Sequence, residues 1–236
     1  MVKRAGKIAQ ANLPWGLVAF MPFGAESGII TREIFIDKVY DHFYHLRNDD
    51  VVVDIGAHVG LFTLRAAKKV RLVVAIEPHP LNYRLLTLNV ALNKLENVIP
   101  VKLALSHYSG KAKLYVGKGS GTHTLKGKPQ QLESGDTIEV KVETLDRLVN
   151  ELRLDKVSFI KIDVEGAELD VLKGSEKVLR ANNELFLAIA AYHYPQEAYE
   201  VARYLHACGL RVFSDGIYVY AFKPSIGSHV SLRCYN

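Results

Sequence analysis

The feature that most constrains the fold of this chain is a series of short, β-branched apolar runs. Clear examples are VVVDIG at 51–56, RLVVAIEP at 71–78 and VSFIKID at 157–163. Continuous apolar runs of this length are typical of strands that are buried on both faces of a parallel sheet. The sequence therefore predicts an α/β fold with a mostly parallel sheet.

Segments with helical spacing of apolar residues separate these runs. They lie at 37–46, 60–69, 81–94, 144–154, 167–180 and 197–209, and Thr144 is placed to cap one of them. Further strands are expected at 97–105 and 184–192, and Asp215-Gly216 predicts a hairpin within 211–222. Helices between strands give right-handed crossovers, and the terminal hairpin adds an antiparallel strand.

Two regions depart from this alternation. Residues 106–144 are rich in Gly, Ser, Lys and Thr, with strand-like pieces at 113–116 and 137–143, and we expect an insertion or hairpin beside the site. The N-terminal region resembles a signal peptide only loosely, because Pro14, Gly16, Pro22 and Gly24 interrupt its apolar stretch. We expect an irregular arm or lid there, with Trp15, Phe20 and Phe23 packed on the domain.

Composition narrows the class of protein. The 236 residues are 49% hydrophobic, which suits one folded domain. Two cysteines, Cys208 and Cys234, exclude a disulfide scaffold and favour a reducing, cytoplasmic location. No apolar run approaches the roughly 20 residues of a membrane helix. The net charge of +5 favours anionic partners without indicating a nucleic-acid binder.

A glycine turn follows the first buried strand, in DIGAHVG at 54–60. Gly56 and Gly60 permit a tight turn and close approach of the backbone to a ligand. The spacing is G-x-x-x-G, not the G-x-G-x-x-G of dinucleotide sites, which argues against a nicotinamide dehydrogenase. A nucleoside with an amino-acid tail fits better, and a plain strand-to-helix turn is the alternative.

An acid closes the second strand. Glu77 follows the apolar part of RLVVAIEP and directly precedes Pro78. A carboxylate at this place accepts hydrogen bonds from ribose hydroxyls in nucleoside-binding folds. The sequence therefore predicts ribose binding by Glu77, with a solvated strand-end acid as the alternative.

Five runs, in this order, resemble the FkbM family of S-adenosylmethionine-dependent methyltransferases. They are VVVDIGAHVGLFT, AIEPHPLNYRLLTLNVALN, VKLALSHYSGKAKLYV, VETLDRLV and SFIKIDVEGAELDVLKGSEKVL. The resemblance implies a class I methyltransferase fold, with a seven-stranded mostly parallel sheet, helices on both faces and an antiparallel terminal strand. It also implies one structural domain, made of an N-terminal arm and leading helix (1–46) and a methyltransferase domain (47–236).

The resemblance also implies cofactor-binding residues. His58 stands where the family usually has asparagine. Thr63 matches a position whose hydroxyl reaches the methionine carboxylate of the cofactor. The alternative is that the Thr63 side chain faces its own helix and does not contact the cofactor. Ala104 and Leu105 fall near the adenine pocket. The full set is Asp54, Gly56, Ala57, His58, Gly60, Thr63, Glu77, Pro78, Ala104 and Leu105.

Candidate catalytic residues follow the fourth and fifth strands. Alternation places Lys161, Asp163 and Glu165 on one side, with Asp163 able to orient the acceptor oxygen or the sulfonium. His193 is the expected general base, as a neutral imidazole, and a strand-capping histidine is the alternative. The family often has Glu-x-His here; Ala191 replaces that glutamate, so no partner for the imidazole is evident.

The charged residues of the sequence suggest which acceptor, and whether a metal ion, binds at the site. Residues 97–132 hold six lysines and no acid, which favours an anionic acceptor or else a solvated face. Thr122, His123 and Glu165 are expected to contact the acceptor. Carboxylates of Asp163, Glu165 and Glu168 suit a hard cation, but such acids more often stabilise helix starts, so we expect no metal.

Three functions remain in view. The first is an O-methyltransferase that acts on a hydroxyl of a small molecule, sugar or glycolipid. The second is an RNA ribose 2′-O-methyltransferase, favoured by the positive charge and the face of Lys161, Asp163 and Glu165. The third is a non-catalytic S-adenosylmethionine-binding module, suggested by the surroundings of His193.

Overall fold

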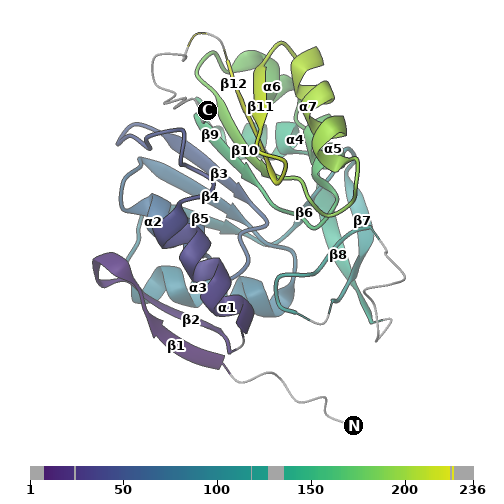
Figure 1. The fold of residues 1–236 in the computed structure, drawn as a ribbon. Coiled ribbons are helices and arrows are strands. Elements are labelled where there is room, and N and C mark those ends of the chain that lie inside the picture. The colour runs from purple at the N-terminus through teal and green to yellow at the C-terminus, as the bar shows by residue number, and fades with distance from the viewer. Residues whose placement is uncertain (1–7, 24, 118, 127–135, 224, 226–236) are drawn as a thin grey trace.

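A seven-stranded sheet crosses the molecule, and the apolar runs of the sequence form its strands (Figure 1). The computed structural model describes residues 8–23, 25–117, 119–126, 136–223 and 225. The strand order is β11-β12-β10-β9-β3-β4-β5. The bounds are β3 (Val51–Ile55), β4 (Leu72–Ile76), β5 (Val98–Val101), β9 (Phe159–Ile162), β10 (Phe186–Ala190), β11 (Arg211–Ser214) and β12 (Tyr218–Phe222).

The direction of the strands confirms the expected fold class. β12 is antiparallel to both of its neighbours, whereas β10, β9, β3, β4 and β5 pair in parallel. From β3 the chain proceeds outward through β4 to β5, and it later returns to the other side of β3 as β9. This reversal beside β3 creates a crevice at the carboxyl ends of the strands, where open α/β sheets bind ligands.

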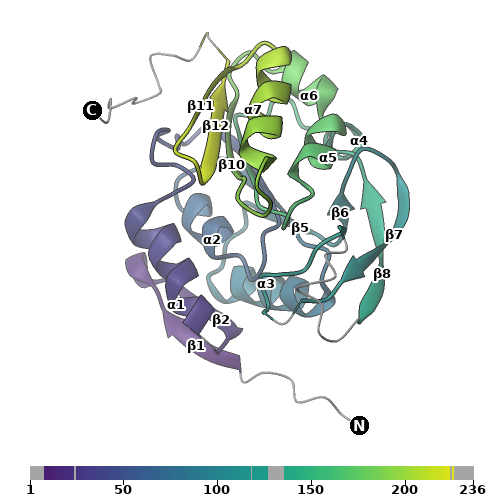
Figure 2. The same ribbon diagram turned by 45° about the vertical axis from the view of Figure 1, so that its right-hand side comes forward.

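Helices cover both faces of the sheet (Figure 2). Side chains of α2 (Leu61–Ala67) and α3 (Pro80–Leu92) pack on one face with Val52 and Phe159. The other face, with Val53 and Ile160, packs against α4 (Leu145–Glu151), α5 (Glu168–Lys173), α6 (Glu176–Ala181) and α7 (Glu197–Ala207). Both faces of the central strands are thus buried, which explains their continuous apolar sequences.

The N-terminal region is more regular than expected. β1 (Ile8–Asn12) and β2 (Val18–Pro22) form an antiparallel hairpin around the short helix η1 (Pro14–Gly16). The amides of Asn89 in α3 and of Asn93, which caps the end of α3, bond to the backbone of β2. Phe20 packs against the core as expected, but Trp15 and Phe23 are 51% and 74% exposed.

The helix expected at 37–46 is wrong. The helical segments lie earlier, in α1 (Ala25–Arg32) and its π-helical continuation η2 (Glu33–Asp37). Lys38 then adopts φ 52°, a left-handed conformation that ends the helix. The apolar residues that suggested a helix instead pack from turns, with Tyr44 stacked on Phe186 of the sheet.

A small second sheet forms from the region predicted to be an insertion. Its strands are β6 (Ala104–Leu105), β8 (Thr137–Glu143) and β7 (Gly110–Tyr115), in that order. β7 and β8 are antiparallel, as a hairpin requires. The strand predicted at 97–105 is divided, because β5 ends at Val101 and β6 belongs to the second sheet.

The helix predicted at 167–180 is also divided, between α5 and α6. Gly174 lies at the break, where an added Cβ would meet the Ser106 carbonyl oxygen at 2.0 Å. A side chain is therefore excluded where the second sheet meets this helix pair. By contrast, the predicted cap is confirmed, since Thr144 accepts a hydrogen bond from the Arg147 N–H at 3.2 Å.

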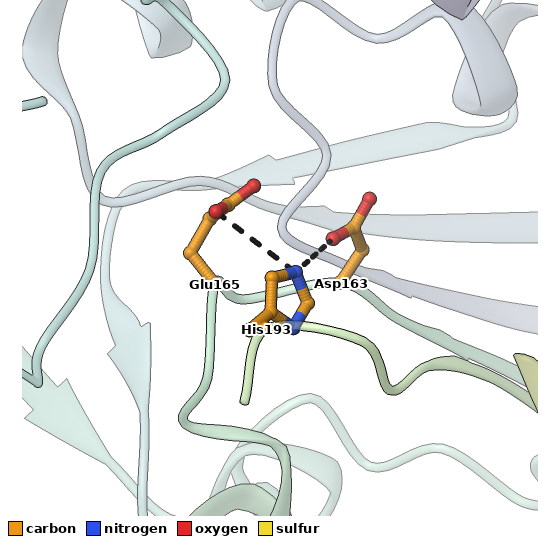
Figure 3. A group of neighbouring side chains, drawn as sticks. All are labelled: Asp163, Glu165 and His193. Atoms are coloured by element: carbon orange, nitrogen blue, oxygen red, sulfur yellow. Dashed lines mark ion pairs between the residues drawn. The ribbon is translucent and has the colours of Figure 1, made fainter. Parts of the chain in front are cut away.

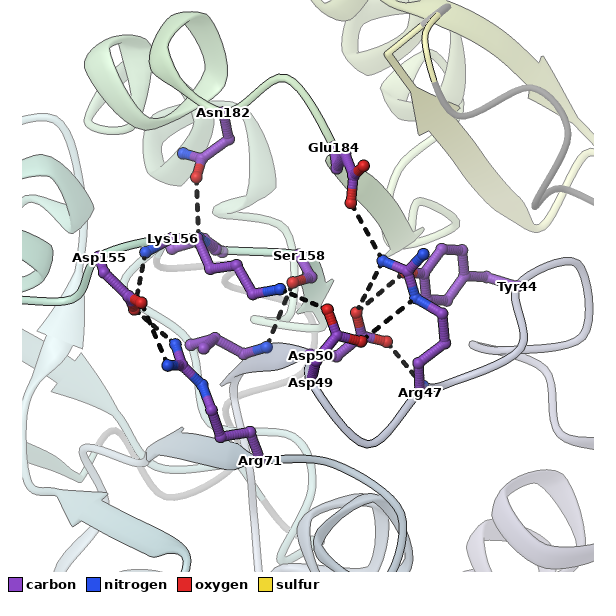
Figure 4. Close-up of polar contacts among 12 residues, drawn as sticks. Tyr44, Arg47, Asp49, Asp50, Arg71, Asp155, Lys156, Ser158, Asn182 and Glu184 are labelled. Carbon is purple, nitrogen blue, oxygen red and sulfur yellow. Dashed lines mark hydrogen bonds and ion pairs between the residues drawn. The ribbon is translucent and has the colours of Figure 1, made fainter.

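Polar contacts tie together the amino ends of the strands, opposite the crevice (Figure 4). Buried Asp50 accepts bonds from the Tyr44 hydroxyl and the Arg47 backbone N–H. Arg71 pairs with Asp155. These contacts fix the strands at one end of the sheet. Among the described residues, no helix has the length and apolar character to cross a membrane.

Candidate active site

A cavity of about 380 Å³ lies at the carboxyl ends of β3, β4 and β9. This is within the range of small-molecule sites. Its walls come from the turns after these strands, from α1 and η2, and from residues 119–126. Most predicted site residues line it: Gly56, Ala57, His58, Glu77, Pro78, Ala104, Leu105, Thr122, His123, Lys161, Asp163 and Glu165.

The turn after β3 requires glycine at position 56. Gly56 has φ 74°, and an added Cβ would lie 1.8 Å from the Asp163 carbonyl oxygen. The N–H groups of Gly56 and Ala57 both donate to the Ile76 carbonyl, at 3.0 and 2.9 Å. The turn is therefore pressed between the ends of β4 and β9, with its backbone at the cavity wall.

Glu77 connects this turn to the end of β4. Its Oε2 accepts the His58 N–H and its Oε1 accepts the His79 N–H, both at 2.9 Å. Burial raises the pKa of Glu77 to about 7, although these hydrogen bonds oppose the shift. Each carboxylate oxygen has a further lone pair, so the group can accept two ligand hydroxyls.

Three histidines gather on the Glu77 side of the cavity. The His79 and His123 rings stack with centroids 4.0 Å apart, and His123 Nδ1 accepts the Gly117 N–H. Burial lowers the pKa of His58 to about 4 and that of His123 to about 3, so both are neutral at pH 7.

Thr122 and His123 both line the cavity, and their contact with the acceptor stays a prediction. His123 lies beside His79, whose N–H bonds to Glu77. The Thr122 hydroxyl donates to the Gly119 carbonyl and accepts the Gly119 N–H. His123 therefore lies near the Glu77 end of the cavity, and Thr122 holds the turn that carries it.

Three predicted cofactor residues lie behind the cavity wall. The Thr63 hydroxyl donates to Asp54 Oδ2 at 2.6 Å, and both residues are fully buried. This favours the alternative for Thr63, in which its side chain faces the protein interior, because Thr63 does not line the cavity. Gly60, with φ 91°, begins α2 against Leu86. Asp54, Gly60 and Thr63 support the turn and do not line the cavity.

Asp163 directly follows β9 and lines the cavity. The Tyr40 hydroxyl donates to its Oδ2 at 2.7 Å. Burial would raise the pKa of Asp163, but His193, Lys161 and the Tyr40 hydroxyl lower it to about 2. Asp163 is therefore a carboxylate at neutral pH. Sequence reasoning missed Tyr40 because it lay in an expected helix, far from Asp163 along the chain.

His193 lies between acids on both sides (Figure 3). Its Nε2 is 3.7 Å from Asp163 Oδ1 and 3.9 Å from Glu165 Oε2. Burial would lower the pKa of His193, but contacts with Asp163, Glu197 and Glu168 raise it to about 11. The four carboxyl groups around His193 therefore favour its protonated form over the neutral imidazole that the sequence predicts, and the general-base role of His193 stays a prediction.

The partner of the imidazole also differs from the family pattern. Glu197 Oε2 lies 3.0 Å from His193 Nδ1 and accepts the His193 backbone N–H at 2.7 Å. Glu197 thus provides the carboxylate that Ala191 lacks. A spacing of four residues, at the start of a predicted helix, was the signal in the sequence that could have found it.

Comparison with known proteins identifies the family. The methyltransferase FkbM domain matches residues 54–212. The chain belongs to the FkbM methyltransferase family. Methyltransferase sdnD of Sordaria araneosa is 34% identical over an alignment of 183 residues, and the match covers 64% of this chain and 70% of sdnD. The 31-O-demethyl-FK506 methyltransferase FkbM of Streptomyces tacrolimicus is 27% identical over 195 residues, covering 70% of this chain and 75% of that protein.

A solved structure supports the fold of this FkbM methyltransferase. The crystal structure of methyltransferase FkbM from Methylobacillus flagellatus superimposes with a TM-score of 0.54 at 20% identity. The match covers 75% of this chain and 44% of that chain. Family and fold together confirm the expected enzyme class, an S-adenosylmethionine-dependent methyltransferase.

The cavity of this FkbM methyltransferase suits that cofactor. Within the described residues, His58 Nε2 and Asn82 Oδ1 are buried without a hydrogen-bond partner, and both residues line the cavity. Such groups are costly to bury unless a polar ligand meets them. Glu77 adds acceptors for hydroxyls, and acids at the Asp163 end suit a positive charge. The residues therefore fit an adenosyl sulfonium compound.

Two groups of side chains lie close enough to share a cation. Donor atoms of Asp163, Glu165 and His193 are within 4.8 Å of one another, as are those of Glu168, His193 and Glu197. The charged imidazole of His193 belongs to both groups and already opposes their negative charge. That no metal takes part in this methyltransferase remains a prediction.

Proposed function

We propose that this chain is an O-methyltransferase that acts on a hydroxyl of an uncharged small molecule. One observation carries the proposal: a carboxylate held ionised, Asp163, faces the cavity that Glu77 closes at its other end. Glu77 can accept hydrogen bonds from the ribose hydroxyls, and Asp163 can accept the proton of the hydroxyl that is methylated. The name of the relative from Streptomyces tacrolimicus, which describes an O-methylation, agrees with this chemistry.

In the proposed reaction each residue has a distinct role. The bound cofactor supplies an electrophilic methyl group on a positively charged sulfur. Glu77 and the turn at Gly56 hold the nucleoside end, and Asp163 and Glu165 favour positive charge at the other end. Asp163 orients the acceptor hydroxyl and takes its proton as the new bond forms. This revises the sequence-based proposal, since the acids around His193 favour its protonated form.

A weakly basic carboxylate suffices for this step. A hydroxyl oxygen becomes strongly acidic as it gains a methyl group, so a group with a low pKa can accept its proton. Lys161 does not compete for the role, because its ammonium donates to the Gly56 carbonyl at 2.6 Å and pairs with Asp54.

The charge of the cavity argues for an uncharged acceptor. Among the described lining residues, Lys161 is the basic one, whereas the acids are Glu33, Glu77, Asp163 and Glu165. Apolar side chains of Ile29, Ile30 and Ile34 line the wall formed by α1 and η2. An acidic and apolar site repels phosphate, which speaks against the RNA alternative and against an anionic acceptor.

The described lysines of the 97–132 segment, which suggested an anionic acceptor, do not line the cavity. Lys111 pairs with Glu139 on the second sheet, and Lys126 pairs with Asp170. Neither residue lines the cavity. Lys118, Lys128 and residues 129–132 lie outside the described residues.

Methyl transfer from labelled S-adenosylmethionine to fractionated extract tests the proposal. We expect label in the small-molecule fraction. The labelled product should survive mild alkali, because a methyl ether is stable under these conditions whereas a methyl ester is hydrolysed. The Asp163→Asn variant should lose this transfer and keep cofactor binding. Label in nuclease-sensitive RNA would favour the ribose methyltransferase instead. Cofactor binding without transfer to any fraction would favour the binding module.

A further inference from the structure

Two fully buried glutamates stand behind His193, on the side away from the cavity. His193 Nδ1 is 3.0 Å from Glu197 Oε2 and 3.4 Å from Glu168 Oε1. Glu168 lies at the start of α5 and Glu197 at the start of α7, and both have no exposed surface. The two helices thus bring a pair of acids to one face of a single imidazole.

The two glutamates also lie close to each other. Oxygens of the two carboxyl groups are within 4.8 Å of one another, beside the same imidazole. Two buried carboxylates this close do not both ionise readily, because their negative charges repel each other. A proton on one of the two groups removes this repulsion, and the protonated group can then donate a hydrogen bond to the other.

The surrounding contacts indicate which group holds the proton. Glu197 Oε2 accepts two bonds from His193, one from the backbone N–H and one from the ring. Glu168 Oε1 accepts the Val164 N–H. More donors converge on Glu197, which favours its ionised form. Consistently, burial and Glu197 raise the pKa of Glu168 well above its usual value, whereas contacts with His193 and Glu168 lower that of Glu197 against the effect of burial.

We propose that Glu168 and Glu197 are positioning residues that share one proton and hold His193 as a cation, with its Nε2 directed at Asp163 and Glu165. Glu168 is the acid of the pair and Glu197 the carboxylate. The groups that face His193 from the elements around it are Asp163, Glu165, Glu168, Tyr192 and Glu197.

The arrangement has a consequence for catalysis, which rests on the proposed function. A cationic His193 beside Asp163 keeps that carboxylate ionised and ready to take the proton of the acceptor. Without the charge of Glu197, the imidazole would lose its proton at a lower pH, and Asp163 would lose its neighbouring cation.

Glutamine substitutions distinguish the two roles in the full-length protein. Glu168→Gln preserves a neutral group that can donate to Glu197, so His193 should titrate almost as in the wild type. Glu197→Gln removes the negative charge, so the pH at which His193 titrates should fall by about 1–3. Imidazole-nitrogen NMR follows this titration without substrate, and a His193→Gln spectrum assigns the resonance. Circular dichroism checks that each variant is folded.

The wild-type titration alone also tests the proposal. We expect the His193 resonance to remain that of a cation from about pH 6 to about pH 9. Titration of wild-type His193 near its ordinary pKa would overturn the proposal, as would equal shifts in the two variants. These results do not depend on methyl transfer, so they separate this proposal from the proposed function.

Once a methyl acceptor is identified, the pH dependence of the methyl-transfer rate gives a second readout. Glu197→Gln should show a rate that declines as pH rises through the new pKa of His193, whereas the wild type and Glu168→Gln should remain level. A purely structural loss would lower the rate equally at every pH, and this result would contradict the positioning role.

Discussion

Asp54 of β3 and Lys161 of β9 are register partners on adjacent parallel strands, with Lys161 Nζ 3.1 Å from Asp54 Oδ1. The same ammonium donates to the Gly56 carbonyl at 2.6 Å. Both side chains are at least 95% buried. One ion pair therefore links the two central strands to the turn at the cavity wall.

Loss of Lys161 should destabilise the protein. Lys161→Met would leave the Asp54 carboxylate buried without its cation, which costs about 3–5 kcal/mol. Denaturant unfolding measures this change in the free energy of unfolding. The double variant Lys161→Met/Asp54→Asn removes both charges and should recover part of the loss. A single variant as stable as the wild type would show that the pair does not support the turn.

Cofactor binding should depend on pH through Glu77. The pKa of this group is about 7 before a ligand binds, and its ionised form is the one that accepts ribose hydroxyls. Affinity for S-adenosylhomocysteine should therefore rise with pH through 7, and it should fall by up to about tenfold per pH unit below. Calorimetry at several pH values measures the dependence.

Variants of Glu77 provide the control for this pH dependence. Glu77→Gln should bind more weakly and with little change between acid and neutral pH. Glu77→Ala should weaken binding by about 1.5–3 kcal/mol, the range for a hydrogen bond to a charged group. Wild-type affinity that is level across this pH range would contradict the role of Glu77.

A side chain at position 56 should disrupt the turn. In Gly56→Ala the new methyl would meet the Asp163 carbonyl, on a backbone with positive φ, so we expect a loss of at least about 2 kcal/mol. Gly28→Ala in α1 is a matched control, because an added Cβ there meets nothing within 4 Å. Thermal unfolding compares the two. Similar melting temperatures for both variants would mean that the turn tolerates a side chain.

The sequence predicted the sheet and the Glu77 end of the cavity well, for a physical reason. Strands buried on both faces must be apolar throughout, and a turn squeezed between strand ends needs glycine. Both demands are local and are therefore visible along the chain. VVVDIG, for example, carries the strand β3 and the glycine turn within six residues.

Contacts between distant segments were harder to predict. Tyr40 bonds to Asp163, which lies 123 positions away, and no local pattern announces this pair. The charge of His193 depends on acids from two stretches of the chain, residues 163–168 and Glu197, so its residue type alone suggested a neutral base. Gly174 breaks a helix whose own periodicity is continuous, because the break is set by Ser106 of another region.

Metal chelation tests the expectation that no cation takes part. Treatment with EDTA should leave methyl transfer unchanged, because the charged imidazole already lies among the carboxylates at the Asp163 end. Activity assays before and after chelation, and again with added magnesium or manganese, provide the measurement. A loss that added metal restores would contradict this expectation.

A crystal structure with S-adenosylhomocysteine tests the central claim most directly. We predict that the ribose hydroxyls bond to Glu77, that the adenine lies beside Ala104 and Leu105, and that the sulfur points toward Asp163. A cavity that stays empty at saturating ligand, or a ligand bound elsewhere on the protein, would contradict the assignment of this cavity as the cofactor site.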